Sequence, residues 1–172
     1  SRRFEPSVQV TREELLSVVS EQPDSVLRAL GARVIRVDSE DTAHGNVAAC
    51  AIDGDPETFW HTEWGTQEAG FPHELVIDVG RLVEIRGFRY LPRQDMNNGW
   101  FAGYEIAVSD DGAEWGTPVS AGEFSFDADE KRIELAEEVV GRYVRLRALT
   151  GYQGKPWVGV AEFDIVAQAS KR

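Results

Sequence analysis

From residue 32 onward, short segments of alternating apolar and polar side chains follow one another, separated by turn residues. In Val144-Arg145-Leu146-Arg147 the alternation runs residue by residue. A period of two puts one set of side chains on a dry face and the other in water, as in an antiparallel strand. Many short strands with few helices predict an all-β protein, an antiparallel β-sandwich. The predicted strands are Arg33–Asp38, His73–Val79, Val83–Leu91, Tyr104–Ser109, Arg132–Leu135, Tyr143–Leu149 and Val160–Val166.

One predicted strand contains a glycine at the point where its apolar phase changes. Val83 and Ile85 are apolar before Gly87, and Phe88 and Tyr90 are apolar after it. One extra residue in a strand shifts the phase in this way, and a glycine inside a strand often marks such a site. We therefore expect a β-bulge at Gly87.

Residues 1–31 have a different pattern. Thr11 and Glu14 have the spacing of a capping box ahead of an apolar helical stretch that stops at Pro23. Ser25 is a candidate cap for a second short helix that ends at Gly31. This pattern predicts a helical linker, or the edge of a preceding domain, over residues 1–31. A single module follows over residues 32–168.

Charge and cysteine content exclude several classes of protein. The 172 residues include 30 acidic and 18 basic side chains, for a net charge of −12. Such a charge repels phosphate backbones and anionic lipid, so we expect no nucleic-acid partner. No apolar run reaches the roughly 18 residues of a membrane span, so we expect no membrane insertion. The single cysteine, Cys50, excludes an internal disulfide, and its apolar neighbours predict a buried, inert thiol.

A tight turn contains two aspartates. Asp53 and Asp55 flank Gly54, and Thr58 follows three residues later. Such a turn can aim carbonyl and carboxylate oxygens inward, and calcium takes about six to eight oxygen ligands. An Asx-type turn with solvated carboxylates is the other interpretation. The segment lacks the ligand pattern of an EF-hand.

An aromatic segment follows this turn. Trp60, His61 and Trp64 lie within five residues of each other. A flat aromatic ring can cover the C–H face of a sugar, while nearby donors and acceptors bind its hydroxyl groups. The other interpretation places Trp60 in the core and Trp64 as a lid on the sandwich.

A polar loop follows the strand that ends near Leu91. Arg93 presents five N–H donors in one plane, and Asn98 offers both a donor and an acceptor. These groups suit recognition of neighbouring hydroxyls. A simple ion pair between Arg93 and Asp95 is the alternative.

Five motifs occur in a fixed order along residues 33–167. They are Ala51-x-Asp53-Gly54-Asp55-x-x-Thr58-x-Trp60-His61-Thr62-x-Trp64, Pro92-Arg93-Gln94-x-x-x-Asn98-Gly99, Tyr104-Glu105-Ile106-x-x-Ser109-x-Asp111-Gly112-x-x-Trp115, Arg142-Tyr143-Val144-Arg145-Leu146 and Val160-Ala161-Glu162-Phe163. In this order and spacing they resemble the discoidin, or coagulation factor five/eight C-type, domains. The resemblance is greatest to the family 32 carbohydrate-binding modules attached to bacterial sialidases and other glycosidases.

The resemblance implies a jelly-roll β-sandwich of the galactose-binding-domain type with a structural calcium ion. Such an ion would join the aspartate turn to the last strand, and it would stabilise the fold because the unfolded chain offers no such site. The implied ligands are the carbonyls of Cys50, Asp55 and Ala161, the side chains of Asp53 and Glu162, and both oxygens of Thr58.

The resemblance also implies a site for galactose or N-acetylgalactosamine. His61 would bond the axial O4, Arg93 would bridge O3 and O4, and Trp64 would stack under the apolar face. Glucose, with an equatorial O4, would leave these polar groups partly unpaired. The implied ligand residues are His61, Trp64, Arg93, Asn98 and Trp157, with Asp41, and next Glu40, as the nearest match to an acidic residue of the first loop.

The predicted function is that of a non-catalytic module, monomeric within a multidomain chain, that brings a secreted or cell-surface bacterial enzyme to glycans ending in galactose or N-acetylgalactosamine. A discoidin-type domain that binds protein or lipid is the alternative, although the single cysteine leaves no closing disulfide. No nucleophile lies in a motif that would support an enzyme. Met96, Trp100 and Phe101 depart from the family's pattern, which leaves the natural glycan open.

Overall fold

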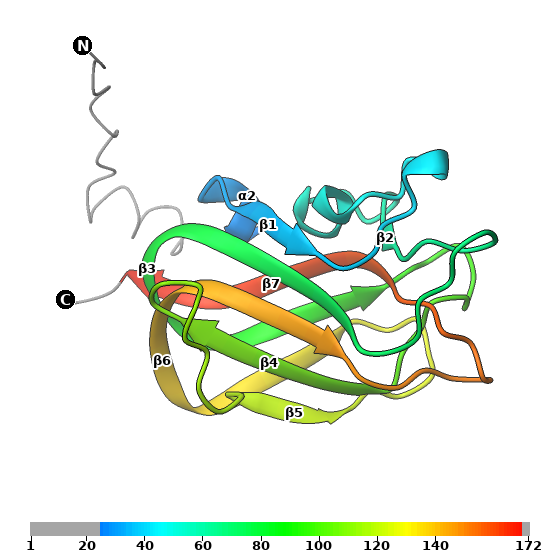
Figure 1. Cartoon of the computed structure of the whole chain (residues 1–172). Helices are drawn as coiled ribbons and strands as arrows, with labels where there is room; N and C mark the ends of the chain where they lie inside the picture. The colour runs from blue at the N-terminus through cyan, green and yellow to red at the C-terminus, as the bar shows by residue number, and fades with distance from the viewer. Residues whose placement is uncertain (1–24, 170–172) are drawn as a thin grey trace, which may run out of the picture.

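Two long strands, β3 (His73–Pro92) and β6 (Lys131–Ala148), pass through both layers of a β-sandwich in the computed structural model, which describes residues 25–169 (Figure 1). Their antiparallel pairing runs from His73 opposite Ala148 to Tyr90 opposite Lys131. The register shifts between Asp78 and Val83, where both strands bend from one layer into the other. The predicted antiparallel β-sandwich is therefore confirmed.

The bend divides the strands between two layers. In the first layer, the start of β3 lies between β1 (Arg33–Val37) and the end of β6, and β4 (Gly103–Ser109) and β5 (Ser120–Glu123) continue from β6. In the second layer, the end of β3 lies between the start of β6 and β7 (Gly159–Ala169), and the two-residue β2 (Trp60–His61) pairs with β7. All of these pairs are antiparallel.

The helical elements are short. They are α2 (Val26–Ala29) and two 3-10 turns, η1 (Thr42–His44) and η2 (Ala48–Ile52). The predicted cap at Ser25 is confirmed, because its side chain accepts a hydrogen bond from the Arg28 N–H. None of the helices in the described part of the chain is long and apolar enough to cross a membrane.

Helix α2 packs as part of the sandwich. Val26 and Leu27 are buried in the core, and their N–H groups donate to the buried Asp164 carboxylate of β7 at 2.9 Å each. The predicted helix that begins near Thr11 lies outside the described residues. The division of the chain at residue 31 stays a prediction.

Most predicted strands are confirmed, with differences at their ends. The two strands predicted over 73–91 form the single β3, and those predicted over 132–135 and 143–149 form the single β6, because hydrogen bonding continues around the bend. Strands β2 and β5 were not predicted. The two residues of β2 are too few to show a periodicity, and three of the four β5 residues are exposed, so β5 shows no alternation of buried and exposed positions.

The core lies between the two layers and is rich in aromatic rings. Tyr104 and Phe124 stack at 4.0 Å, and Phe88 and Phe163 stack at 5.9 Å. Val144 and Leu146 face this core as predicted, but Arg145 is buried on the other face, with its guanidinium 4.8 Å from the Trp115 ring centre. The face of β6 that was predicted to be exposed to solvent is thus partly covered by Trp115.

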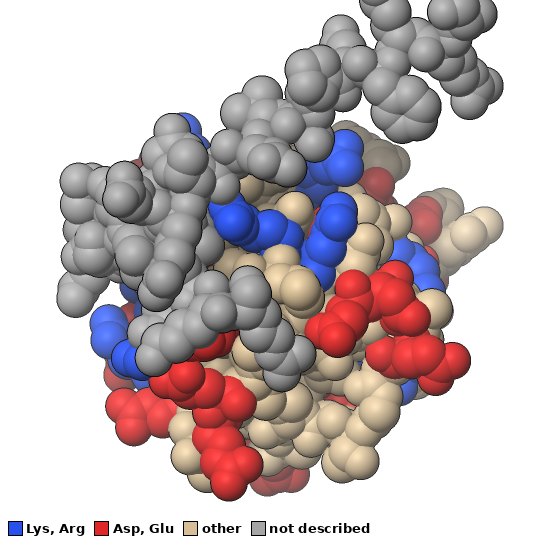
Figure 2. Space-filling view, turned by 90° about the vertical axis from the view of Figure 1, so that its left-hand side faces the viewer, with Lys and Arg blue, Asp and Glu red and all other residues tan. Residues whose placement is uncertain are grey.

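Charged groups of both signs share the end of the molecule where the strands bend. Figure 2 shows acidic groups gathered in patches and basic groups lying between them, with no continuous basic surface on the described part of this face. The loops gather at the opposite end (Figure 1). The positions of the strands that lead into these loops therefore determine which loop side chains come together.

The bulge at Gly87 is confirmed and leads to a test. The register of β3 shifts between Ile85 and Gly87 against both neighbours, and a Cβ on Gly87 would lie 2.2 Å from the Ile133 carbonyl oxygen. Because the backbone around Gly87 and Ile133 would have to move to make room for a Cβ, we expect Gly87→Ala to lower the free energy of unfolding by roughly 1–3 kcal/mol. Urea denaturation measures this, with Gly70→Ala as control, since a Cβ there meets nothing within 4 Å. Equal losses in both variants would contradict the bulge assignment.

Candidate functional site

A pocket of about 400 Å³ opens at the loop end of the sandwich. It collects side chains from η1, from β2 and the segment after it, from the segment after β3, and from the segment before β7. The predicted residues His61, Trp64, Arg93, Asn98 and Trp157 all line it. The full lining is His44, Asn46, His61, Trp64, Arg93, Met96, Asn98 and Trp157.

Strand pairing explains why these distant residues meet. His61 of β2 pairs with Gly159 at the start of β7, and Pro92 at the end of β3 pairs with the next residue, Val160. Gly159 has no side chain, and a Cβ there would lie 3.4 Å from both the Arg93 Cβ and the His61 Cδ2. The glycine therefore leaves room for His61 and Arg93 to lie side by side.

His61 forms a buried acceptor at the pocket wall. Its Nδ1 lies 2.6 Å from the Thr62 carbonyl oxygen, which can only accept, so Nδ1 carries the proton and donates. Its Nε2 is buried and has no hydrogen-bond partner among the described residues. Burial lowers the pKa of His61, so the ring is neutral at pH 7 and Nε2 keeps its lone pair. A hydroxyl group that entered the pocket would satisfy this nitrogen.

Arg93 forms the ion pair with Asp95 that was one of its two interpretations, and its role in recognising hydroxyl groups stays a prediction. Its Nε and Nη2 donate to the two oxygens of Asp95 at 2.5 and 3.0 Å, and it also lines the pocket. The guanidinium lies 4.3 Å from the Phe59 ring centre. The hydrogen bonds from Arg93 lower the pKa of Asp95, so this carboxylate is ionised at neutral pH. Asp95 and Phe59 hold the guanidinium plane while its other N–H groups stay available.

Asp41 is a buried carboxylate that organises one wall of the pocket. Its oxygens accept from His44 Nδ1 at 2.9 Å, from Asn46 Nδ2 at 3.1 Å and from Trp64 Nε1 at 3.2 Å. Burial alone would raise the pKa of Asp41, but these hydrogen bonds together lower it. Asp41 itself is absent from the lining, although three of its partners are in it. Its role as a direct ligand stays a prediction.

Sequence reasoning missed His44 and Asn46. The His44 ring stacks on Trp64 with centroids 4.9 Å apart and an angle of 11° between the planes. The only available signal was the spacing of Asp41, His44 and Asn46 ahead of the aromatic segment. This spacing does not show that the Trp64 indole would bond the Asp41 carboxylate.

The two tryptophans of the aromatic segment have opposite environments. Trp60 is 1% exposed and donates from Nε1 to the Ser39 carbonyl at 2.9 Å, whereas Trp64 is 45% exposed. Trp157 closes another side of the pocket, with its Nε1 3.1 Å from Glu68 Oε1. Trp60 therefore belongs to the core, and Trp64, which stacks on His44 and lines the pocket, keeps part of its ring surface exposed.

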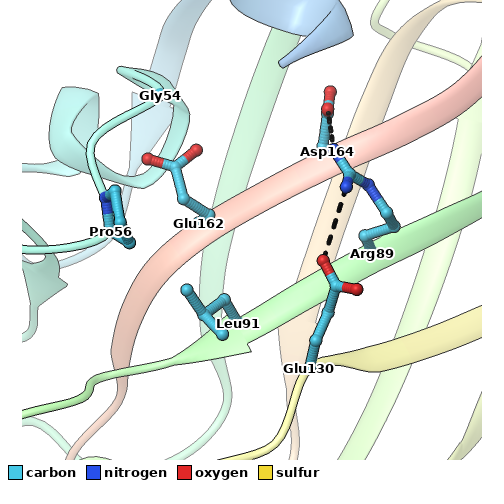
Figure 3. A pocket seen from close by; sticks show the side chains of 7 residues that line it. All are labelled: Gly54, Pro56, Arg89, Leu91, Glu130, Glu162 and Asp164. Atoms are coloured by element: carbon cyan, nitrogen blue, oxygen red, sulfur yellow. Dashed lines mark hydrogen bonds and ion pairs between the residues drawn. The ribbon is translucent and has the colours of Figure 1, made fainter. Parts of the chain in front are cut away.

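A second polar cluster lies where the aspartate turn meets β7. Thr58 Oγ1 donates to Asp53 Oδ2 at 2.5 Å, and the Glu162 carboxylate points toward the turn that contains Gly54 and Pro56 (Figure 3). One carboxylate oxygen of Glu162, Oε1, is buried without a partner. Burial and the adjacent Asp53 raise the pKa of Glu162 to about 9. These oxygens fit a hard cation, which would provide the missing positive charge.

The rest of the predicted metal set is mostly main-chain oxygen. Among the described residues, no group of three His, Cys, Asp or Glu side chains could hold a metal ion. A cation here would depend on the carbonyls of Cys50, Asp55 and Ala161. Cys50 is partly buried rather than fully buried as expected, and burial raises the pKa of its thiol.

Comparison with known proteins gives the family. The F5/8 type C domain matches residues 34–163, and the chain belongs to this family. A galactose oxidase of Gibberella zeae is 38% identical over 136 residues, and a sialidase of Micromonospora viridifaciens is 40% identical over 135 residues. These matches cover 78% and 77% of this chain, but it spans only about a fifth of either enzyme (20% and 21%).

A solved structure shares the fold. The Clostridium perfringens module CpGH89CBM32-5, in complex with GalNAc-β-1,3-galactose, superposes with a TM-score of 0.72 at 29% identity. The match covers 79% of this chain and 96% of that chain. The chain therefore has the β-sandwich fold of family 32 carbohydrate-binding modules.

The different burial of the two tryptophans predicts different effects on stability. Trp60→Ala removes a large core side chain, so we expect it to lower the free energy of unfolding by about 3–5 kcal/mol. Trp64→Ala removes an exposed ring, so we expect a loss below about 1 kcal/mol. Thermal or urea unfolding of both variants tests this. A larger loss for Trp64→Ala would mean that the two roles are reversed.

Proposed function

We propose that this chain is a non-catalytic carbohydrate-binding module that recognises glycans ending in galactose or N-acetylgalactosamine. The observation that carries the proposal is the pocket itself, where the unpartnered Nε2 of His61 lies among donors and the rings of Trp64 and Trp157. Galactose has an axial O4 next to O3, so two hydroxyls lie close together beside one apolar ring face. His61 accepts from O4, and Arg93 and Asn98 bind O3 and O4.

The aromatic groups supply the apolar half of the site. Trp64 offers its exposed ring to the C–H face of the sugar, and Trp157 adds a second ring to the pocket wall. The complex of CpGH89CBM32-5 with GalNAc-β-1,3-galactose supports this sugar class. The similarity to parts of a galactose oxidase and a sialidase supports the attachment of the module to a secreted enzyme that acts on such glycans.

A discoidin-type role in protein or lipid binding is less well supported. Lipid insertion would need apolar loop tips, and Trp64 and Met96 are exposed at this end. However, the same pocket contains His61, Arg93 and Asn98, whose polar groups would lose hydrogen bonds against lipid. The polar wall therefore favours a ligand rich in hydroxyl groups.

We also propose that the cluster of Asp53, Thr58 and Glu162 holds a structural calcium ion, together with the carbonyls of Cys50, Asp55 and Ala161. The buried unpartnered oxygen of Glu162 supports this. When bound, the ion supplies positive charge between two carboxylates and joins the turn to β7. Because the unfolded chain lacks this arrangement, binding adds to the stability of the fold.

The sugar proposal predicts a clear selectivity in calorimetric titrations. A shallow, solvent-open site is expected to bind galactose and N-acetylgalactosamine with micromolar to millimolar Kd, about −8 to −4 kcal/mol. Glucose is expected to bind at least about tenfold more weakly, because its equatorial O4 cannot reach His61 and Arg93 together. Equal affinities for galactose and glucose would contradict the axial-O4 argument.

Variants separate the contributions to this binding. Trp64→Ala is expected to abolish it, and Arg93→Lys to weaken it severely, because an ammonium group cannot span two hydroxyls as a planar fork does. Leu82→Ala is the matched control, since Leu82 is similarly exposed, at 41%, but lies where the register of β3 shifts between Asp78 and Val83 and does not line the pocket.

The calcium proposal predicts a metal-dependent melting temperature. Adding a chelator is expected to lower Tm in the wild-type chain and to leave Tm of Asp53→Ala unchanged, because that variant has already lost a ligand. Asp55→Asn is the control: only its carbonyl is a proposed ligand, and its exposed side chain accepts from the Glu57 N–H. If chelation leaves the wild-type Tm unchanged and elemental analysis finds no metal, the site is not a calcium site.

A further inference from the structure

A third histidine is buried outside the pocket and contacts two acceptors. The side chain of His73, at the start of β3, has no exposed surface. Its Nδ1 lies 2.8 Å from Asp38 Oδ2, and its Nε2 lies 2.6 Å from the Pro156 carbonyl oxygen. A carbonyl and an ionised carboxylate can only accept hydrogen bonds, so both ring nitrogens must donate. This geometry requires a doubly protonated, positively charged ring.

The three groups belong to segments far apart in the chain. Asp38 follows β1, and its other oxygen accepts from the Glu74 N–H of β3 at 2.7 Å. Pro156 lies in the segment between β6 and β7, directly before Trp157 of the pocket. This segment lies at the same end of the sandwich as the loop that leads into β3 (Figure 1). His73 therefore ties the segment that contains Trp157 to the first layer of the sandwich.

We propose that His73 is a positioning residue for the pocket: its charged ring holds residues 149–158 against β1 and β3, and sugar affinity falls when the ring loses a proton. This inference rests on the proposed function for its effect on affinity, but the effect on the segment itself is independent of any sugar. A neutral ring keeps only one N–H, so either Asp38 or the Pro156 carbonyl loses its donor.

The hydrogen-bond partners of His73 favour this charge assignment. Asp38, from the end of β1, is the charged group that acts on His73. Just before β3, the Phe71 ring lies 5.1 Å from the His73 ring. On β3 itself, the Glu74 carboxylate forms ion pairs with Arg36 and Arg147.

Two further residues near this contact are not acidic. Strand β6 places Ala148 opposite His73. Lys155, beside Pro156, directs its Nζ to the Trp157 ring at 4.9 Å.

The direction of the pH effect follows from these contacts. Burial alone would lower the pKa of His73, but the hydrogen bonds with Asp38 and Pro156 raise it above its usual value, near 6.5. A raised pKa in the folded state means that the stabilising contact is fully present below about pH 6.5. It is lost as the pH rises through the folded-state pKa. His61 acts in the opposite direction: its pKa is lowered, and acid would remove its acceptor.

The first test needs no sugar. Hydrogen exchange by NMR on the full 172-residue chain reports on the Lys155 N–H, which bonds the Tyr152 carbonyl, and on the Trp157 indole N–H. After correction for intrinsic rates, protection is expected to fall about three- to tenfold between pH 6 and pH 9, roughly the effect of one hydrogen bond. His73→Gln is expected to show the low protection at both pH values. Unchanged protection in the wild-type chain would overturn the proposal.

The second test measures galactose Kd over the same pH range. We expect Kd to rise about three- to tenfold toward pH 9 in the wild-type chain, the effect of roughly one hydrogen bond, and to be weak and flat in His73→Gln. Asp38→Asn is expected to move the transition to lower pH, because it removes the charge that favours the protonated ring. Arg86→Gln, a change in the exposed ion pair with Glu138 just after the bend of β3, is the control and should keep the wild-type slope.

The outcomes distinguish the two proposals. If galactose does not bind at any pH but the segment responds, the sugar proposal fails and the role of His73 in the fold stands. If galactose binds with the same Kd at pH 6 and pH 9, the positioning role of His73 is wrong and the sugar proposal stands. If His73→Gln retains the wild-type pH slope, another group causes it, which also overturns the inference.

Discussion

The continuous pairing of β3 with β6 and β7 determines where the rest of the chain can lie. β3 takes part in both layers, so its start and its end are fixed by one hydrogen-bonded ladder. It ends at Pro92 beside Val160, and β2 joins the same end of β7 through His61 and Gly159. The loop residues that line the pocket are thus brought together by strand ends, and the missing side chain at Gly159 leaves the space between them.

Although the protein is strongly acidic, none of the described residues that line the pocket is a carboxylate. The whole chain has a net charge of −12, yet the lining contains histidine, asparagine, arginine, methionine and tryptophan. The nearby carboxylates serve as supports: Asp41 holds His44, Asn46 and Trp64, and Asp95 holds Arg93. Holding donors and rings in place before a ligand arrives lowers the entropic cost of binding. This arrangement is suited to a small ligand with neutral hydroxyl groups.

Much of the fold could be predicted because its strands alternate with a period of two, and the bulge at Gly87 followed from one change of phase. The bends in β3 and β6 could not be predicted, because periodicity within one segment does not show whether hydrogen bonding continues into the next segment. Five pocket residues followed from the resemblance to the family, which its ordered motifs support. The contact between Trp64 and Asp41 could not be predicted, since the two residues are 23 positions apart in the sequence and come together only in the folded chain.

The central claim is that the pocket of His61, Trp64, Arg93, Asn98 and Trp157 binds the sugar, and the indole N–H signals of the tryptophans test it directly. In ¹H–¹⁵N NMR spectra recorded during titration with galactose, we predict shifts for Trp64 and Trp157, which line the pocket. Trp60 in the core and Trp115 beside Arg145 are predicted to stay in place. Shifts confined to Trp115, or no shift of Trp64 at saturating galactose, would contradict the account.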